Sequence, residues 1–244
     1  MSTPKGVAIL LAGGLGTRVR AVSPHLPKPF IPVAGKPFIE WILRYWAQTG
    51  LRSFVISLGH LAHVGEEYFR NRPEDGLEIH TISETEPLGT GGAVLYARQL
   101  ALQADPVLIA NGDSIFLADP TPMWQALESD SVDGVILSAI MEDTSRYGVL
   151  RVADDGTLLG FYEKRPGRGA INAGVYLLRK RVFDRFPTKL PLSMETEVFP
   201  QLIAAGVRLM AHPDRAAFLD IGTPEELLRA TAFLETQFPR ALDL

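Results

Sequence analysis

Residues 7–18 read VAILLAGGLGTR, and the fold class follows from this stretch. Val7–Leu11 is a continuous apolar run, which is typical of a strand buried on both faces. The glycines at positions 13, 14 and 16 let the backbone turn tightly and bring its N–H groups close to an anion or a flat ring. The stretch therefore predicts a buried strand followed by a ligand-binding turn.

The rest of the first half alternates short apolar runs with longer amphipathic ones. The pattern predicts further strands at Phe54–Leu58, Leu77–Ile82 and Val107–Ala110. It predicts helices at Phe38–Ala47, Ala62–Arg70 and Ala93–Leu102. Strands and helices in this order indicate right-handed βαβ units and a mainly parallel sheet.

The second half carries strand-like runs with few helices between them. These runs are Gly134–Ile140, Val149–Val152, Leu158–Glu163 and Gly174–Leu178, and they predict a mixed or antiparallel extension of the first sheet. Helices return at Glu195–Ala205 and at Pro224–Phe238, where Thr223 opens a capping box. We therefore predict a Rossmann-like three-layer α/β/α fold formed by a single domain, residues 1–244.

The composition excludes several classes of protein. There is no cysteine, which rules out a disulfide scaffold, a cysteine nucleophile and a thiolate zinc site. The 24 Lys+Arg and 28 Asp+Glu give a net charge of −4, which argues against general nucleic-acid binding. The apolar run at residues 7–12 is too short for a membrane span and lacks the features of a secretory signal. We expect a cytoplasmic protein without a membrane partner.

Two familiar phosphate-binding patterns can be tested against the glycine-rich turn. The dinucleotide fingerprint G-x-G-x-x-G would start at Gly14 and Gly16, but Val19 stands where its third glycine belongs. The Walker pattern fails because no Gly-Lys-Ser/Thr triplet follows. A glycine-rich turn can also serve tight packing alone, yet Arg18 and Arg20 add cationic donors for phosphate oxygens.

Lys28 offers a second local positive charge. Pro27 and Pro29 hold the backbone extended on either side of it, so the ammonium is presented on a stiff loop. A lysine between prolines is also an ordinary loop composition, but a chain of net negative charge needs local cations to bind a polyanion. Lys28 is therefore a candidate phosphate-binding residue.

The complete set of motifs resembles the sugar-1-phosphate nucleotidyltransferases, also called nucleoside-diphosphate-sugar pyrophosphorylases. The resemblance starts with residues 12–18 and the Pro-Lys-Pro triplet at 27–29. It continues in the family's order through residues 35–37, 86–92, 111–113, 147–149, 163–164, 172–174 and 220–224. Each piece alone is common, whereas the ordered set spans nearly the whole chain and implies an enzyme that makes a nucleotide sugar.

The family's reaction gives the matching positions their expected roles. A sugar 1-phosphate oxygen attacks the α-phosphorus of a nucleoside triphosphate and pyrophosphate leaves, so catalysis depends on positioning and charge neutralisation. The resemblance implies that Arg18, Lys28 and Asp113 are catalytic. It also implies a nucleotide-binding set made of Leu11, Ala12, Gly13, Gly14, Gly16, Thr17, Arg18, Glu86, Gly91 and Asp113.

Asp113 and Asp220 are the expected metal ligands. They follow the apolar runs Val107–Ala110 and Ala216–Leu219, so both are expected at the carboxyl edge of the sheet. Two carboxylates with phosphate oxygens and water suit Mg²⁺. Without the other motifs, Asp113 is more typical of a turn and Asp220 of a residue before a helix cap, so the resemblance carries this assignment.

The second half is expected to hold the sugar phosphate. The resemblance implies that Glu163 binds sugar hydroxyls, that Lys164 reaches the phosphate, and that Gly148 and Asn172 line the pocket. A solvated turn is the alternative for residues 163–166. The nucleotide-binding part would then cover about residues 1–115 together with the C-terminal metal aspartate, and the sugar-phosphate part about 116–222.

Residues 26–38 and 86–92 look most like the D-glycero-D-manno-heptose 1-phosphate guanylyltransferase branch of the family. The expected substrates are therefore GTP and heptose 1-phosphate, giving GDP-heptose for a cell-surface polysaccharide. The sequence at 19–22, where many relatives carry Leu-Pro, argues against a thymidylyltransferase. A uridylyltransferase acting on N-acetylmuramate 1-phosphate or another hexose 1-phosphate is the alternative. A nucleotide-sugar sensor is the non-enzyme alternative, and a homo-oligomer is common in the family.

Overall fold

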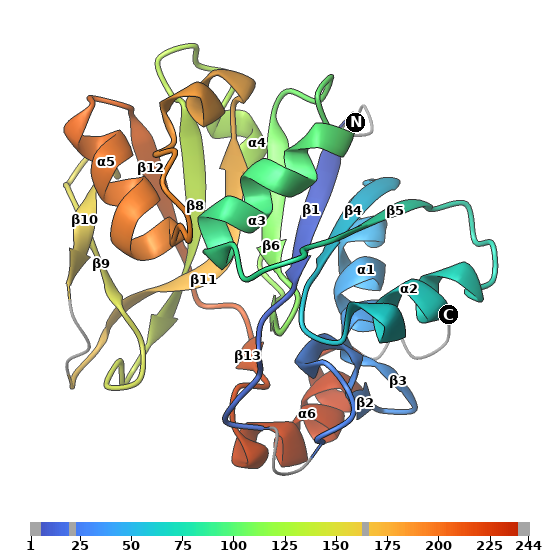
Figure 1. The fold of residues 1–244 in the computed structure, drawn as a ribbon. Coiled ribbons are helices and arrows are strands. Elements are labelled where there is room, and N and C mark those ends of the chain that lie inside the picture. The colour runs from blue at the N-terminus through green and yellow to red at the C-terminus, as the bar shows by residue number, and fades with distance from the viewer. Residues whose placement is uncertain (1–5, 20–22, 163–165, 239–244) are drawn as a thin grey trace.

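The computed structural model describes residues 6–19, 23–162 and 166–238, and a nine-stranded sheet runs through its centre (Figure 1). Four parallel strands form one half of this sheet, in the spatial order β6-β1-β4-β5. They are β1 (Val7–Ala12), β4 (Ser53–Leu58), β5 (Glu78–Ser83) and β6 (Val107–Asn111). From β1 the chain first adds β4 and β5 on one side of this strand, and it later adds β6 on the other side. The gap between the carboxyl ends of β1 and β6 is therefore a topological switch point, where open α/β sheets bind ligands.

The other half of the sheet is mixed. The long strand β11 (Gly169–Leu178) runs antiparallel to β6 and to β8 (Gly134–Met141), and β12 (Leu209–Asp214) pairs in parallel with β8. β9 (Val149–Val152) and β10 (Leu158–Tyr162) form an antiparallel pair beside β11. The predicted fold class, a mainly parallel sheet with an antiparallel extension, is confirmed.

Helices cover both faces of the sheet, because alternate residues of the strands point to opposite sides. Ala8 and Leu10 of β1 belong to one core cluster with Trp41, whereas Ile9 belongs to a second cluster with Val94. The first face is covered by α1 (Phe38–Gln48), α2 (Ala62–Arg70), α4 (Thr121–Ala126) and α6 (Pro224–Gln237). The second is covered by α3 (Gly89–Ala97) and α5 (Phe199–Ala204).

Several element boundaries differ from the prediction. The helix expected from Ala93 begins at Gly89, so the glycine-rich segment 89–92 is its first turn, and the last residues form a short 3₁₀ turn, Arg98–Leu100. The helix expected over Glu195–Ala205 is divided into a π-helical turn, Met194–Val198, and α5. Pro200 has no N–H for a regular α-helical bond, which accounts for this break.

Other short elements were not predicted. The edge strand β12 was missed because His212, Pro213 and Asp214 interrupt its apolar pattern. Also missed were β2 (Pro32–Val33), β3 (Lys36–Pro37), β7 (Ser114–Phe116), α4, and the 3₁₀ turns Lys28–Phe30 and Lys180–Arg185. β7 pairs with β13 (Phe218–Asp220) in a separate two-stranded sheet. Within the described residues, no helix is both long and apolar enough to cross a membrane.

Candidate active site

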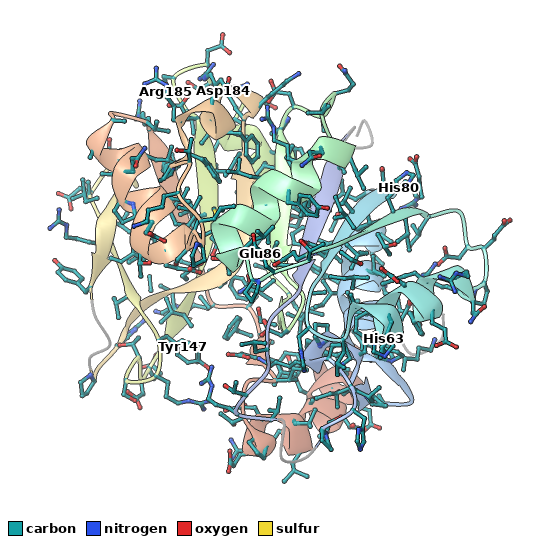
Figure 2. All side chains as sticks on the ribbon, viewed as in Figure 1. His63, His80, Glu86, Tyr147, Asp184 and Arg185 are labelled. Atoms are coloured by element: carbon teal, nitrogen blue, oxygen red, sulfur yellow. The ribbon has the colours of Figure 1, made fainter. Side chains whose placement is uncertain are left out.

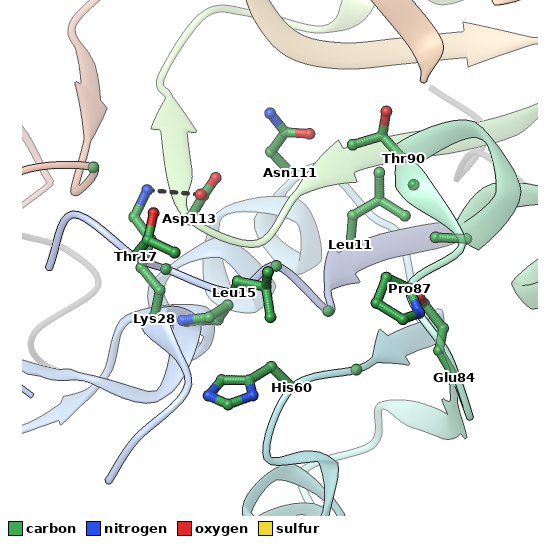
Figure 3. A pocket seen from close by; sticks show the side chains of 18 of the residues that line it. Leu11, Leu15, Thr17, Lys28, His60, Glu84, Pro87, Thr90, Asn111 and Asp113 are labelled. Atoms are coloured by element: carbon green, nitrogen blue, oxygen red, sulfur yellow. Dashed lines mark hydrogen bonds and ion pairs between the residues drawn. The ribbon is translucent and has the colours of Figure 1, made fainter. Parts of the chain in front are cut away.

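A pocket of about 560 Å³ opens at the switch point between β1 and β6 (Figure 3). Its walls come from the ends of four parallel strands and from the start of α3. The glycine-rich turn after β1 forms one wall, and His60 after β4 and Glu84 after β5 form another. Thr90 of α3, Asn111 at the end of β6 and Asp113 after it complete the pocket. The sheet topology thus gathers segments that are far apart in the sequence.

Close backbone packing explains the glycines of the turn. A side chain at Gly13 would place its Cβ 2.8 Å from Glu84 Oε1, and one at Gly59 would place its Cβ 2.6 Å from the Gly13 oxygen. The His60 N–H also donates to the Gly13 oxygen at 3.2 Å. Gly16 has a φ of +57°, which favours glycine. The turn is therefore locked against the end of β4, with its outer face toward the pocket.

Most of the predicted nucleotide-binding set lines this pocket, namely Leu11, Gly13, Gly14, Gly16, Thr17, Arg18, Glu86 and Asp113. Ala12 is buried in the core, with 1% of its surface exposed. Gly91 is buried in the first turn of α3, and its N–H donates to the Leu192 oxygen at 2.7 Å. The Gly91 N–H thus already has a partner within the protein.

Lys28 joins the two predicted metal ligands. Its Nζ lies 2.7 Å from Asp113 Oδ2 and 3.0 Å from Asp220 Oδ1, and only 8% of the Lys28 side chain is exposed. Both aspartates were expected at the edge of the main sheet, which is wrong for Asp220, because it ends β13 of the small sheet. Antiparallel pairing places Asp220 opposite Ser114, directly after Asp113. Non-local strand pairing therefore brings the two carboxylates together.

The donor set at this point fits a hydrated Mg²⁺. Asp113 and Asp220 converge on one cationic atom, and their side chains are 37% and 21% exposed, so both remain accessible to a ligand. Among the described residues there is no group of three or more His, Cys, Asp or Glu placed to hold a metal. Mg²⁺ commonly uses one or two carboxylates together with substrate phosphates and water, so two carboxylates suffice.

Glu84 is a pocket residue that the sequence reasoning missed. Its carboxylate accepts from the Leu88 N–H at 3.2 Å and from Ser57 Oγ at 3.4 Å, and no ion pair engages it among the described residues. Burial raises the pKa of the Glu84 carboxyl above its ordinary value. The available signal was its position two residues after the predicted strand Leu77–Ile82. His60 and Asn111 also follow predicted strands within two residues.

Asn172 and Gly148, two of the predicted sugar-side residues, do not line this pocket. Asn172 lies in β11, where its amide donates to Tyr176 Oη at 2.8 Å, and Gly148 precedes β9. Burial raises the pKa of the neighbouring Tyr147, and the nearby Asp220 carboxylate adds to this rise. Figure 2 shows Tyr147 away from Glu86, which lies beside the start of α3. Glu163, Lys164 and the candidate phosphate-binding Arg20 lie outside the described residues.

Known proteins are similar to this chain in both sequence and architecture. The family model described as nucleotidyl transferase matches residues 7–237. A mannose-1-phosphate guanylyltransferase from Mycobacterium tuberculosis is 32% identical over 96% of this chain, which spans 66% of that relative. A D-glycero-alpha-D-manno-heptose 1-phosphate guanylyltransferase from Aneurinibacillus thermoaerophilus is 34% identical over 93% of this chain and 98% of its own length.

A solved structure, HddC from Yersinia pseudotuberculosis complexed with GMP-PN, has a TM-score of 0.80 and 31% identity. The similarity covers 93% of this chain and 98% of HddC. The family match runs from the first strand through the last helix and includes every wall of the pocket. This chain belongs to the nucleotidyl transferase family.

Proposed function

We propose that this protein transfers a guanylyl group from GTP to a sugar 1-phosphate and releases pyrophosphate. The preferred acceptor is D-glycero-α-D-manno-heptose 1-phosphate, and the product is GDP-heptose. In this reaction the sugar phosphate oxygen bonds to the α-phosphorus of GTP while the bond to the β-phosphate bridge breaks. Relatives that share almost their full length with this chain are named heptose 1-phosphate guanylyltransferases, which supports this acceptor over mannose 1-phosphate.

The Glu84 carboxylate carries the assignment to guanine. An ionised carboxylate only accepts hydrogen bonds, and guanine offers two adjacent donors, N1–H and the N2 amino group, on one edge. Uracil and thymine instead present one N–H between two carbonyl oxygens, which a carboxylate repels. Glu84 lines the pocket without an ion-pair partner among the described residues, and each of its oxygens accepts one hydrogen bond, from Ser57 or from Leu88, so each keeps a lone pair for a base. This chemistry disfavours the alternative uridylyltransferase.

Positive charge for the triphosphate comes from Arg18 and Lys28 in this proposal. Arg18 is exposed at the pocket wall and makes no ion pair in the part of the chain described. Lys28 supplies an ammonium where the carboxylates of Asp113 and Asp220 converge. We further propose that these two aspartates hold Mg²⁺, which when bound would neutralise charge on the reacting phosphates.

A substrate panel tests this function. The protein is incubated with Mg²⁺, each of four nucleoside triphosphates, and heptose, mannose, glucose or N-acetylmuramate 1-phosphate, and released pyrophosphate is measured. We expect the highest kcat/KM with GTP and heptose 1-phosphate. The highest turnover with UTP would contradict the guanine assignment. If no combination released pyrophosphate, the proposed enzymatic activity would be contradicted.

A variant of Glu84 connects the base preference to the carboxylate. Glu84→Gln should lower the ratio of kcat/KM for GTP over UTP by about tenfold or more, because its amide replaces one acceptor with a donor. Glu67→Gln, an exposed change on α2 outside the pocket, is the matched control and should leave the ratio unchanged. An unchanged ratio in Glu84→Gln would refute the role of the carboxylate.

A further inference from the structure

A chain of side-chain hydrogen bonds connects β11 with the first turn of α3. Asn172 Nδ2 donates to Tyr176 Oη at 2.8 Å, and Tyr176 Oη donates to Glu195 Oε1 at 3.3 Å. Thr90 Oγ1 lies 3.5 Å from Glu195 Oε2 and accepts from the Met194 N–H at 2.9 Å. One end of this chain is the predicted sugar-binding amide, and the other is a wall of the nucleotide pocket.

Each hydrogen bond in this chain fixes the donor and acceptor roles of the next, so every polar group in it has a partner. The Gly174 N–H donates to Asn172 Oδ1 at 2.9 Å, which directs the amide nitrogen of Asn172 toward Tyr176. Tyr176 accepts that bond and uses its own proton for Glu195. Tyr176 is fully buried, and burial raises the pKa of its phenol, so the hydroxyl remains a donor. The Asn172 amide keeps one N–H for a ligand.

A backbone irregularity sets the position of Asn172. The register of β11 against β8 shifts between Asn172 and Val175, and Gly174 has a φ of +73°. A Cβ at Gly174 would lie 2.3 Å from Asn111 Nδ2, so glycine here also makes room for a residue that lines the nucleotide pocket. The bulge therefore places Asn172 and Asn111 in neighbouring strands at the boundary between the two halves.

The segment that carries Glu195 is itself fixed on α3. The Leu192 oxygen accepts from the Gly91 N–H at 2.7 Å, and the Leu192 N–H donates to the Leu88 oxygen at 2.8 Å. Gly89 leaves space for this segment, because a Cβ there would lie 2.5 Å from the Leu192 oxygen. The π-helical turn begins directly afterwards and presents Glu195 toward Tyr176. A displacement of Glu195 would therefore be transmitted to the pocket wall at residues 88–91.

Packing alone does not require the hydroxyl of Tyr176. The ring contacts Phe199 edge to face at a centroid distance of 4.9 Å, within a cluster of otherwise apolar side chains. A phenylalanine would keep these ring contacts without a polar group to satisfy. The hydroxyl is therefore useful where it joins Asn172 to Glu195.

We propose that Tyr176 and Glu195 are positioning residues that couple the sugar-phosphate site at Asn172 to the nucleotide site at Thr90. The inference rests on the proposed function, because it assigns sugar binding to Asn172. Binding of a sugar phosphate orders the Asn172 amide, and the hydrogen bonds through Tyr176 and Glu195 extend this order to the α3 wall. Each substrate then binds more tightly when the other is present.

The test uses Tyr176→Phe and Glu195→Gln in the intact chain. For each protein, KM for the sugar 1-phosphate, kcat, and the Kd of a non-hydrolysable GTP analogue are measured, the Kd with and without saturating sugar phosphate. Tyr96→Phe, a partly buried tyrosine of α3 whose hydroxyl is not in the chain, controls for tyrosine replacement. Glu197→Gln controls for charge loss in the same turn, because Glu197 accepts from the Ser193 N–H instead.

We expect both Tyr176→Phe and Glu195→Gln to raise the sugar KM about tenfold, because the first removes the hydrogen bond to a charged acceptor and the second makes that acceptor neutral and places an amide donor in the chain. The analogue Kd measured alone should stay within about twofold, whereas its tightening by sugar phosphate should be lost. The double variant should be no worse than either single one. Multiplying effects, or a wild-type sugar KM in Glu195→Gln, would overturn the coupling.

Thermal unfolding identifies any variant that fails to fold, and Glu195→Gln, on a partly exposed turn, then carries the test. A failure of the proposed function can be distinguished from a failure of the coupling. If the proposed function is wrong, the wild-type protein itself will not turn over GTP with a sugar 1-phosphate. An active wild type with unaffected Tyr176→Phe and Glu195→Gln would refute only the coupling.

Discussion

Lys28→Met isolates the charge of the ammonium between Asp113 and Asp220. Methionine keeps an unbranched stem of similar length and removes the positive charge, so packing changes little. In the wild-type protein the ammonium contacts the two carboxylates at 2.7 and 3.0 Å. Without it, the carboxylates are left near one another with no cation between them.

The expected cost follows from the repulsion of these carboxylates. Two unit charges about 5 Å apart repel by about 3 kcal/mol at an effective dielectric constant of about 20. Asp113 and Asp220 are 37% and 21% exposed, so water screens part of this repulsion. We expect the free energy of unfolding to fall by about 2 kcal/mol, which in a chain of this size lowers Tm by about 4–8 °C.

Thermal unfolding with and without millimolar Mg²⁺ measures this effect. If the carboxylates form the metal site, Mg²⁺ should restore much of the lost stability in Lys28→Met, with a smaller shift in the wild type. Lys189→Met, at an exposed position away from the pocket, should match the wild type in both conditions. Unchanged stability together with no response to Mg²⁺ would refute both the repulsion and the metal assignment.

Two further predictions concern the pocket. Because burial raises the pKa of the Glu84 carboxyl above its ordinary value of 4.5, the carboxylate becomes protonated as the pH falls through a window that begins above 4.5. KM for GTP should rise as the pH falls through this window, and a profile that Glu84→Gln leaves unchanged would contradict it. Gly59→Ala places its Cβ 2.6 Å from the Gly13 oxygen and should lower Tm by several degrees, about 2 kcal/mol of strain. Gly14→Ala meets nothing within 4 Å and should not change Tm, as calorimetry would show.

The parallel half of the fold could be predicted because its signals are local. Val7–Leu11 and Phe54–Leu58 are continuous apolar runs, and both lie within strands of the structure. The glycine-rich turn follows the first run directly, so its place at the switch point follows from the βαβ order. Most of the predicted nucleotide-binding residues therefore lie in one pocket.

The parts that could not be predicted depend on contacts between distant segments. Residues 89–92 look like a loop because three are glycine, yet packing against Leu192 fixes them as the first turn of α3. Glu84 carries no motif of its own, and only the parallel arrangement of β5 beside β4 brings it to Gly13. Propensity and periodicity contain no information on such pairings.

The cluster formed by Lys28, Asp113 and Asp220 contributes both to the proposed chemistry and to the contacts that hold the fold together. Lys28 begins a 3₁₀ turn, whereas Asp113 and Asp220 lie at the paired ends of β7 and β13, so the contacts of Lys28 join a separate segment to this small sheet. A partly buried ion-pair cluster of this kind is often no more stabilising than apolar residues of similar volume. Apolar replacement of all three residues could therefore preserve or raise stability, but it would remove every group proposed to neutralise the phosphates at this point. The net charge of −4 does not prevent binding of a polyphosphate in this proposal, because the exposed Arg18 lines the pocket and the Mg²⁺ proposed at Asp113 and Asp220 would offset the carboxylates there.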